Sequence, residues 1–272
     1  MDVPQETPPQ ETPPRRDAVS QAPMVPVSAE DFARAKRRIV FKWLGVVLVV
    51  ALVGIGIYLK STSSQDGRKA LNDGEQMLKA GRYAEAIQSL DRALAVDGKL
   101  ANAYLFRARA HVALVQPEAA VKDFDKALQL DPSNADALVE RAALHLRTND
   151  YQGVIADCEQ AIRLNPRLTY AYTLRGMAFR ELGNLPKSLE DFNHAVELAP
   201  GLDTYFQRAT TYQAMGEHPK ALSDLDQVVS LFPTSPMGYL ARAKSREATG
   251  DLAGARSDRE TGRNLEAREP GQ

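Results

Sequence analysis

The sequence lacks several features that mark particular classes of enzymes and nucleic-acid-binding proteins. It has one cysteine, which excludes an internal disulfide. It contains neither a GxxxxGK phosphate loop nor an HExxH zinc motif. Residues 61–272 hold 26 Lys and Arg against 29 Asp and Glu, a net charge of about −3 rather than the basic patch of a phosphate-binding protein. We therefore expect no enzyme activity, no cofactor, no small-molecule substrate and no nucleic acid.

Residues 1–27 form a proline-rich tail that contains the tandem repeat PQETPPQETPP. Large apolar side chains are almost absent before Met24, so the segment cannot bury enough surface to offset its ordering entropy. We expect a disordered tail that is partly polyproline II. The alternative is a docking peptide for a domain that reads proline-rich segments.

Residues 28–60 predict a transmembrane helix with a basic flank. Ser28 and Asp31 resemble a capping box. Residues 39–59 are apolar apart from Lys42, and about 21 residues of helix span about 31 Å, enough to cross a bilayer core. Trp43 and Tyr58 lie near the two ends, where amphipathic rings prefer the membrane interface. Five basic residues precede or begin the run: Arg34, Lys36, Arg37, Arg38 and Lys42.

The basic flank predicts the orientation of this helix. By the positive-inside rule, the N-terminus lies in the cytoplasm and the following residues outside it, which in a bacterium is the periplasm. A cleaved signal peptide is an alternative, since Ser61 and Ser63 give a small-x-small pattern. A buried core helix fits less well, because the run is apolar on every face. Residues 61–66, STSSQD, are expected to be a short polar linker.

A repeat with a period of about 34 residues organises the rest of the chain. Its clearest copy is 101–134, and its signature recurs after one and two periods. The recurring positions are Tyr104, Arg107, Ala108, Ala120, Asp123, Phe124, Ala127 and Pro132, then Leu138, Arg141, Ala142, Val154, Asp157, Cys158, Ala161 and Pro166, then Tyr172, Arg175, Gly176, Ser188, Asp191, Phe192, Ala195 and Pro200. In spacing and residue types this pattern resembles the tetratricopeptide repeat (TPR) family.

Each unit predicts two amphipathic helices, which approach closely at small residues such as Ala108 and Ala120, while large residues such as Tyr104 and Phe124 fill the space beside them. We expect an all-α fold with six such units at 67–100, 101–134, 135–168, 169–201, 202–235 and 236–269. The resemblance implies that they stack into a right-handed superhelical solenoid, since one unit cannot cover its apolar face. The first and last units depart from the pattern, as terminal units do.

An arginine recurs in the first helix of the units and an aspartate in the second. We expect an ion-pair ladder, within or between units, that fixes the register of the helices. The alternative is two independent solvated faces. The residues are Arg107 and Asp123, Arg141 and Asp157, Arg175 and Asp191, Arg208 and Asp224, and Arg242 and Asp258.

The resemblance to the TPR family implies a concave groove lined by the first helices. Its expected lining residues are Leu71, Leu105, Arg109, Val112, Val139, Leu146, Tyr170, Met177, Arg180, Phe206 and Leu240. Such a mixed surface suits an extended peptide or a partner helix. The aliphatic residues among these have an alternative role, which is to pack against the neighbouring first helix.

Other candidate sites in the repeats have simpler explanations. His111 and His145 share a position that usually holds a packing aromatic, and no acid or cysteine completes a ligand set. Cys158 takes the place of Phe124 and Phe192, so we expect a small buried hydrophobe. By resemblance, family members clamp chaperone C-termini with lysines, asparagines and an arginine at set first-helix positions. Here those positions hold Leu71 and Glu75, or Leu105 and Arg109, with Glu140 or Leu174 following, so we expect no such clamp.

These patterns predict a membrane-anchored, non-enzymatic scaffold or adaptor that binds a partner protein or peptide in its groove. The predicted topology resembles that of bacterial envelope proteins that assist assembly or secretion. One alternative is an accessory subunit that stabilises a membrane enzyme complex through its span. Another is a receptor or co-chaperone of an organelle membrane, with the repeats facing the cytosol.

Overall fold

The computed structural model describes residues 29–268, and between residues 31 and 63 it describes only some of the side chains. The predicted tail at residues 1–27, the capping residue Ser28 and the last residue of the predicted sixth unit lie outside the described residues. The chain divides into two units between Lys60 and Ser61. The two boundaries predicted before the repeats, at residues 60/61 and 66/67, both fall within one helix, α1.

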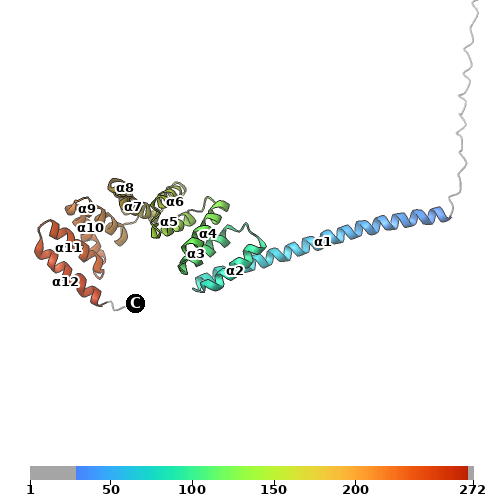
Figure 1. Cartoon of the computed structure of the whole chain (residues 1–272), viewed down its shortest axis with the longest axis horizontal. Helices are drawn as coiled ribbons and strands as arrows, with labels where there is room; N and C mark the ends of the chain where they lie inside the picture. The colour runs from blue at the N-terminus through green and yellow to red at the C-terminus, as the bar shows by residue number, and fades with distance from the viewer. Residues whose placement is uncertain (1–28, 269–272) are drawn as a thin grey trace, which may run out of the picture. The chain divides into compact units, whose positions relative to one another are not determined.

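Twelve helices follow one another in the described residues, and no strand occurs among them (Figure 1). They are α1 (Ala29–Lys79), α2 (Tyr83–Val96), α3 (Ala101–Ala113), α4 (Pro117–Leu130), α5 (Ala135–Arg147), α6 (Tyr151–Leu164), α7 (Thr169–Glu181), α8 (Leu185–Leu198), α9 (Leu202–Ala214), α10 (His218–Leu231), α11 (Pro236–Ala248) and α12 (Leu252–Arg268).

The part of α1 before Ser61 forms the first unit. Six of its large aliphatic side chains are each more than half exposed: Leu48, Val49, Val50, Leu52, Val53 and Ile55. In the described part of the chain, no helix meets the length and apolarity that a membrane crossing requires. The membrane-spanning segment at residues 39–59 therefore stays a prediction from the sequence.

The linker expected at residues 61–66 is wrong, because the structure continues α1 through these residues to Lys79. The stretch contains neither glycine nor proline, so no strong helix breaker lies within it. Residues 67–79 then pack on α2. A Cβ atom on Gly74 would lie 2.6 Å from Cγ of Leu90, so this close approach requires the glycine.

The second unit is a stack of helix pairs. The pairs α3 and α4, α5 and α6, α7 and α8, α9 and α10, and α11 and α12 each pack together, and each second helix also packs on the first helix of the next pair. The first helices α5, α7, α9 and α11 contact one another in sequence. The first helices therefore form a layer of their own, on which the expected groove would lie.

In the core between helices, small residues of one helix lie against large residues of its partner. Ala108 of α3 is fully buried beside Phe124 of α4, and Gly176 of α7 lies so close to Phe192 of α8 that an added Cβ would be 3.0 Å from the ring. Cys158 of α6 is likewise fully buried at the equivalent position. Burial raises the pKa of the Cys158 thiol to about 12, which leaves it protonated and unreactive at neutral pH.

The turn within each pair places one residue in the left-handed region of φ. Four of these residues are glycines, whereas Val115 has φ 57° and Asn149 has φ 59°. The turn needs this conformation because the next backbone N–H donates to a carbonyl in the last turn of the first helix, as Gln116 does to His111 at 2.9 Å. Asparagine tolerates the left-handed region, but a β-branched residue there is strained. Val115 is also 72% exposed, so packing does not compensate the strain.

We predict that Val115→Gly stabilises the chain by about 1 kcal/mol, since relief of about 1–2 kcal/mol of left-handed strain exceeds the added entropy of the unfolded glycine. For the second unit this corresponds to a melting temperature higher by about 2–4 °C, measured by circular dichroism.

The matched control is Gly183→Val, which makes the opposite change at the equivalent turn between α7 and α8, where φ is 76°. It should lower the melting temperature by a similar amount. Equal melting temperatures for Val115→Gly and the parent would show that Val115 is not strained.

Candidate functional site

Five arginines, which we call the arginine ladder, connect the helices of the stack. They are Arg107, Arg141, Arg175, Arg208 and Arg242. Each donates two hydrogen bonds, from Nε and Nη2, to the aspartate 16 residues later in the second helix of its own pair, at 2.6–3.0 Å. The aspartates are nearly inaccessible, with side-chain exposures of 2–6%. Bidentate pairing is what makes a buried carboxylate tolerable.

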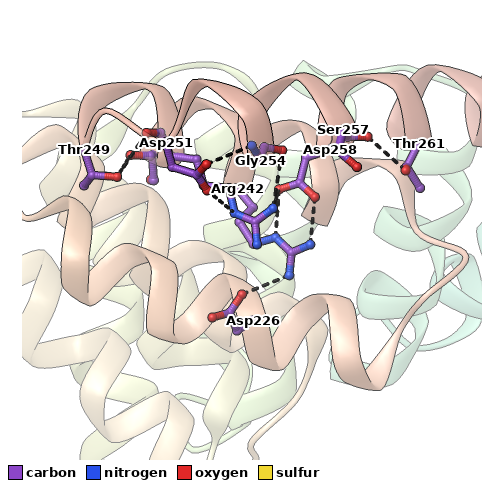
Figure 2. A network of polar contacts seen from close by, with 10 residues as sticks. Asp226, Arg242, Thr249, Asp251, Gly254, Ser257, Asp258 and Thr261 are labelled. Carbon is purple, nitrogen blue, oxygen red and sulfur yellow. Dashed lines mark hydrogen bonds and ion pairs between the residues drawn. The ribbon is translucent and has the colours of Figure 1, made fainter.

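Four ladder arginines use their remaining nitrogen to reach the preceding pair. Nη1 donates to Asp91 from Arg107, to Asp125 from Arg141, to Asn193 from Arg208 and to Asp226 from Arg242, at 2.5–3.1 Å. Figure 2 shows the last case, in which Arg242 lies between Asp226 of α10 and Asp258 of α12. The ladder therefore operates within and between pairs at once.

The contact to the preceding pair has a sequence signal that our sequence analysis missed. The acceptor lies two residues after the ladder aspartate, or its equivalent, of the preceding pair: Asp91, Asp125, Glu159, Asn193 and Asp226 share this position. Each is an acid or an amide, and only at Glu159 do the described residues show no hydrogen bond to the next arginine, Arg175.

The electrostatics of the ladder follow from this pairing. The hydrogen bonds that the five ladder arginines donate to the paired aspartates raise the pKa of Arg107, Arg141, Arg175, Arg208 and Arg242. Burial raises the pKa of Asp191, and its hydrogen bonds with Arg175 oppose this shift. In four pairs the guanidinium also lies 5.4–5.9 Å from the centre of a tyrosine ring three residues earlier. The ladder groups thus pair mainly with one another, and only Nη1 of Arg175 has no acceptor among the described residues.

The histidines at the shared position lie beside the ladder. His111 Nδ1 is 2.7 Å from Gln116 Oε1, and its Nε2 is 3.7 Å from Asp123. His145 Nδ1 is 3.0 Å from Asp150, whose carboxylate also caps α6. Within residues 29–268, no cluster of His, Cys, Asp and Glu is arranged to hold a metal ion.

The expected groove residues differ in exposure. Leu105 and Val139 are only 5% and 7% exposed, so they pack against neighbouring helices rather than line an open groove. Leu71, Val112, Leu146 and Phe206 are half-buried against the core, and Arg109, Met177, Arg180 and Leu240 are half-buried as well. Tyr170 is 55% exposed. Of the eleven, Arg109, Val112 and Tyr170 come together in one pocket.

This pocket, which we call the α3–α5–α7 pocket, has a volume of about 340 Å³. A small residue leaves room for it. The ninth residue of each repeat, which we call position 9, is Ala143 in α5 but Arg109, Met177 and Thr210 in other first helices. Its lining is mostly apolar and consists of Arg109, Val112, Ala113, Phe124, Glu140, Ala143, Leu144, Arg147 and Tyr170. Ala143 was not among the expected groove residues, although it is smaller than the residues at the equivalent position of the neighbouring units.

Two arginines of the pocket have different partners. Arg109 in α3 donates to both carboxylate oxygens of Glu140 in α5, at 2.6–3.1 Å, so these charges cancel. Arg147, the last residue of α5, is exposed and has no hydrogen bond or ion pair with any described residue. The pocket thus carries one uncompensated positive charge at its edge.

A second, smaller hollow of about 90 Å³ adjoins the first. It shares Val112, Leu144 and Arg147 with the α3–α5–α7 pocket and adds Val115, Gln116, Pro117 and Thr148. The strained Val115 and the unpaired Arg147 therefore border the same hollow.

The later first helices are joined by polar side chains. Arg180 in α7 donates to Thr210 Oγ1 and Gln207 Oε1 in α9, each at 2.8 Å, and burial lowers the pKa of Arg180. Gln213 of α9 donates to Ser245 Oγ in α11 at 2.7 Å. These bonds use side chains that would otherwise face a ligand. The residues around the α3–α5–α7 pocket are the better candidate site.

Comparison with known proteins identifies the repeats. Two family models, both described as tetratricopeptide repeat, match the chain, one at residues 77–135, 107–167 and 140–203 and the other at residues 203–235. Together they span residues 77–235, more than half of the 272 residues. No curated protein matches the chain.

Solved structures share the fold. PilF of Pseudomonas aeruginosa is 19% identical, with 78% of this chain and 95% of that chain covered and a TM-score of 0.64. MamA (residues 41 to the end) of Desulfovibrio magneticus RS-1 is 23% identical, with 61% and 94% covered and a TM-score of 0.59. YrrB, described as a TPR protein with an unusual peptide-binding site, is 24% identical, with 62% and 88% covered and a TM-score of 0.57. At these identities the likeness concerns the fold.

We predict that Asp157→Asn destabilises the chain by about 3 kcal/mol, because it leaves the Arg141 guanidinium without its buried partner. Asp125→Asn, which removes the exposed carboxylate on the same arginine, should cost less than about 1 kcal/mol. Chemical denaturation followed by circular dichroism measures both.

A double-mutant cycle with Arg141→Gln and Asp157→Asn isolates the pair itself. We expect a coupling energy of at least about 1 kcal/mol, the range typical of residues in one ion-pair network. If the two substitutions are additive, the ladder does not fix the helices.

Proposed function

We propose that this chain, which belongs to the tetratricopeptide repeat family and is a protein–protein interaction scaffold, binds an extended segment of a partner protein along its first helices. The α3–α5–α7 pocket would receive one large apolar side chain of that segment. Scaffolds of this family are typically non-enzymatic, and the chemistry of this groove agrees with such a role.

The single observation that carries the proposal is the pocket's apolar, concave lining. Its volume of about 340 Å³ lies at the low end of the roughly 300–1,000 Å³ range of ligand sites, which suits a side chain rather than a large cofactor. Tyr170 exposes much of its ring there, and exposed tyrosines favour protein interfaces because the ring is apolar and the hydroxyl is polar. An extended peptide would gain most of its affinity from one such anchor.

The proposal also includes a location for the protein in the cell. The apolar run at residues 39–59 would anchor the chain in a membrane, with the N-terminus in the cytoplasm and the repeats outside it, where the scaffold could serve envelope assembly or secretion. The six exposed aliphatic side chains at Leu48–Ile55 support this, because so many exposed apolar groups on one helix favour a lipid or protein environment over water.

The pocket is tested by filling it. Ala143→Met places there the side chain that α7 carries at the same repeat position, Met177, so the helix should accept it. We expect capture of partner proteins from an extract of the source cells to fall at least tenfold, as quantified by mass spectrometry with the full chain as bait.

Ala214→Met is the matched control, since it adds the same atoms to an exposed alanine at the end of α9, outside the pocket lining. It should leave capture unchanged, and both variants should melt like the parent. Equal capture by Ala143→Met and the parent would count against the pocket.

The membrane anchor makes its own prediction. The full chain should stay in the membrane fraction after extraction at alkaline pH, and a variant without residues 39–59 should be released. Added protease should cleave the repeats on whole spheroplasts but not in sealed inside-out vesicles. Release of the full chain would refute the anchor, and the reverse protection pattern would refute the orientation.

A further inference from the structure

The α3–α5–α7 pocket and the smaller hollow meet at Arg147, and this arrangement says more about the partner than an apolar pocket alone. Arg147, Val112 and Leu144 line both hollows. The other residues that line the two hollows are apolar or neutral, apart from the ion pair of Arg109 and Glu140 in the larger one. An occupant of either hollow therefore comes within reach of one guanidinium.

We infer that the partner segment carries an acidic residue next to its large apolar side chain, with the acid on Arg147 and the apolar side chain in the α3–α5–α7 pocket. This inference rests on the proposed function and adds the charge of the ligand.

The charges around the pocket favour a ligand with one negative charge. Glu140 already accepts three hydrogen bonds from Arg109, so this glutamate is not available to a second cation. Arg147 has five N–H donors and no acceptor among the described residues. A carboxylate can take two of these donors side by side, which makes arginine selective for carboxylates in geometry as well as charge.

The smaller hollow offers a reason why a valine occupies the strained turn position 115. A β-branched residue is kept in the left-handed turn conformation although the equivalent turns use glycine or asparagine, and its side chain is 72% exposed. Strain of this kind at an exposed position points to a role outside folding. Beside Pro117, the Val115 methyl groups extend the apolar wall past Arg147, where the chain of the partner leaves the large pocket.

The test uses blocked tetrapeptides that differ by one isosteric change: phenylalanine followed by aspartate, and phenylalanine followed by asparagine, each also in the reverse order. Acetyl and amide caps remove the terminal charges, so the aspartate carboxylate is the only charge. Binding to the full chain in lipid nanodiscs is measured by ligand-detected NMR, with empty nanodiscs as the blank.

We expect the better aspartate peptide to bind about two- to fivefold more tightly than its asparagine counterpart, the size typical of an exposed ion pair. High salt should remove this preference because it screens exposed charges. Arg147→Gln should abolish the preference without weakening the asparagine peptide, whereas Arg147→Lys should keep part of it.

Val115→Gly separates binding from folding. It should raise the melting temperature and yet weaken both peptides, a combination that partial unfolding cannot produce. If its binding equals that of the parent, Val115 is not part of the surface.

The outcomes distinguish the inference from the proposed function. Equal binding of the aspartate and asparagine peptides, or a preference that survives Arg147→Gln, overturns the inference, while loss of both peptides in Ala143→Met still supports the pocket. If Ala143→Met changes neither peptide, or if neither peptide binds saturably, both the pocket and the inference are wrong.

Discussion

A carboxylate that is almost fully buried must be paired, and in this protein every ladder aspartate meets that requirement through an arginine of the helix packed against it. Each ladder aspartate is held by two hydrogen bonds from an arginine on the partner helix, and four of these arginines also hold the preceding pair. The fork of a guanidinium has a fixed geometry, so three helices must lie at fixed positions around it. Apolar packing between small and large residues supplies most of the stability, but it is tolerant of sliding. The directional bonds of the ladder are the feature that we propose fixes the register of the stack.

The same regularity explains why the pocket lies where it does. A repeat array repeats its backbone, so differences along the groove come from side chains that vary at fixed positions. Position 9 of the repeat is the example, because Ala143 leaves a space that Arg109, Met177 and Thr210 would fill. Later in the chain, longer polar residues such as Arg180 and Gln213 bond to the next first helix instead. One alanine in a row of larger residues is thus enough to open a site.

Much of the fold could be predicted from the sequence because it depends on period and residue size. The spacing of Ala108, Phe124 and Pro132 repeats, and it sets the helix pairs. The arginine and aspartate positions were found for the same reason. The linker at residues 61–66 was predicted wrongly, since polar composition alone does not end a helix. Groove positions such as Leu105 and Val139 are buried because helix-to-helix distance, which the period does not specify, decides whether a side chain meets a neighbour or solvent. The pocket depends on the small side chain of Ala143, and no sequence motif marks such a position.

The position of the α3–α5–α7 pocket has a mechanical consequence. Its walls come from three successive pairs, from α3, α5 and α7 with Phe124 of α4, so a guest would touch three pairs of the stack at the same time. A solenoid bends and stretches by small rotations between neighbouring turns. An occupant that bridges three of them resists those rotations, so the elasticity of the coil at this place depends on whether a guest is present.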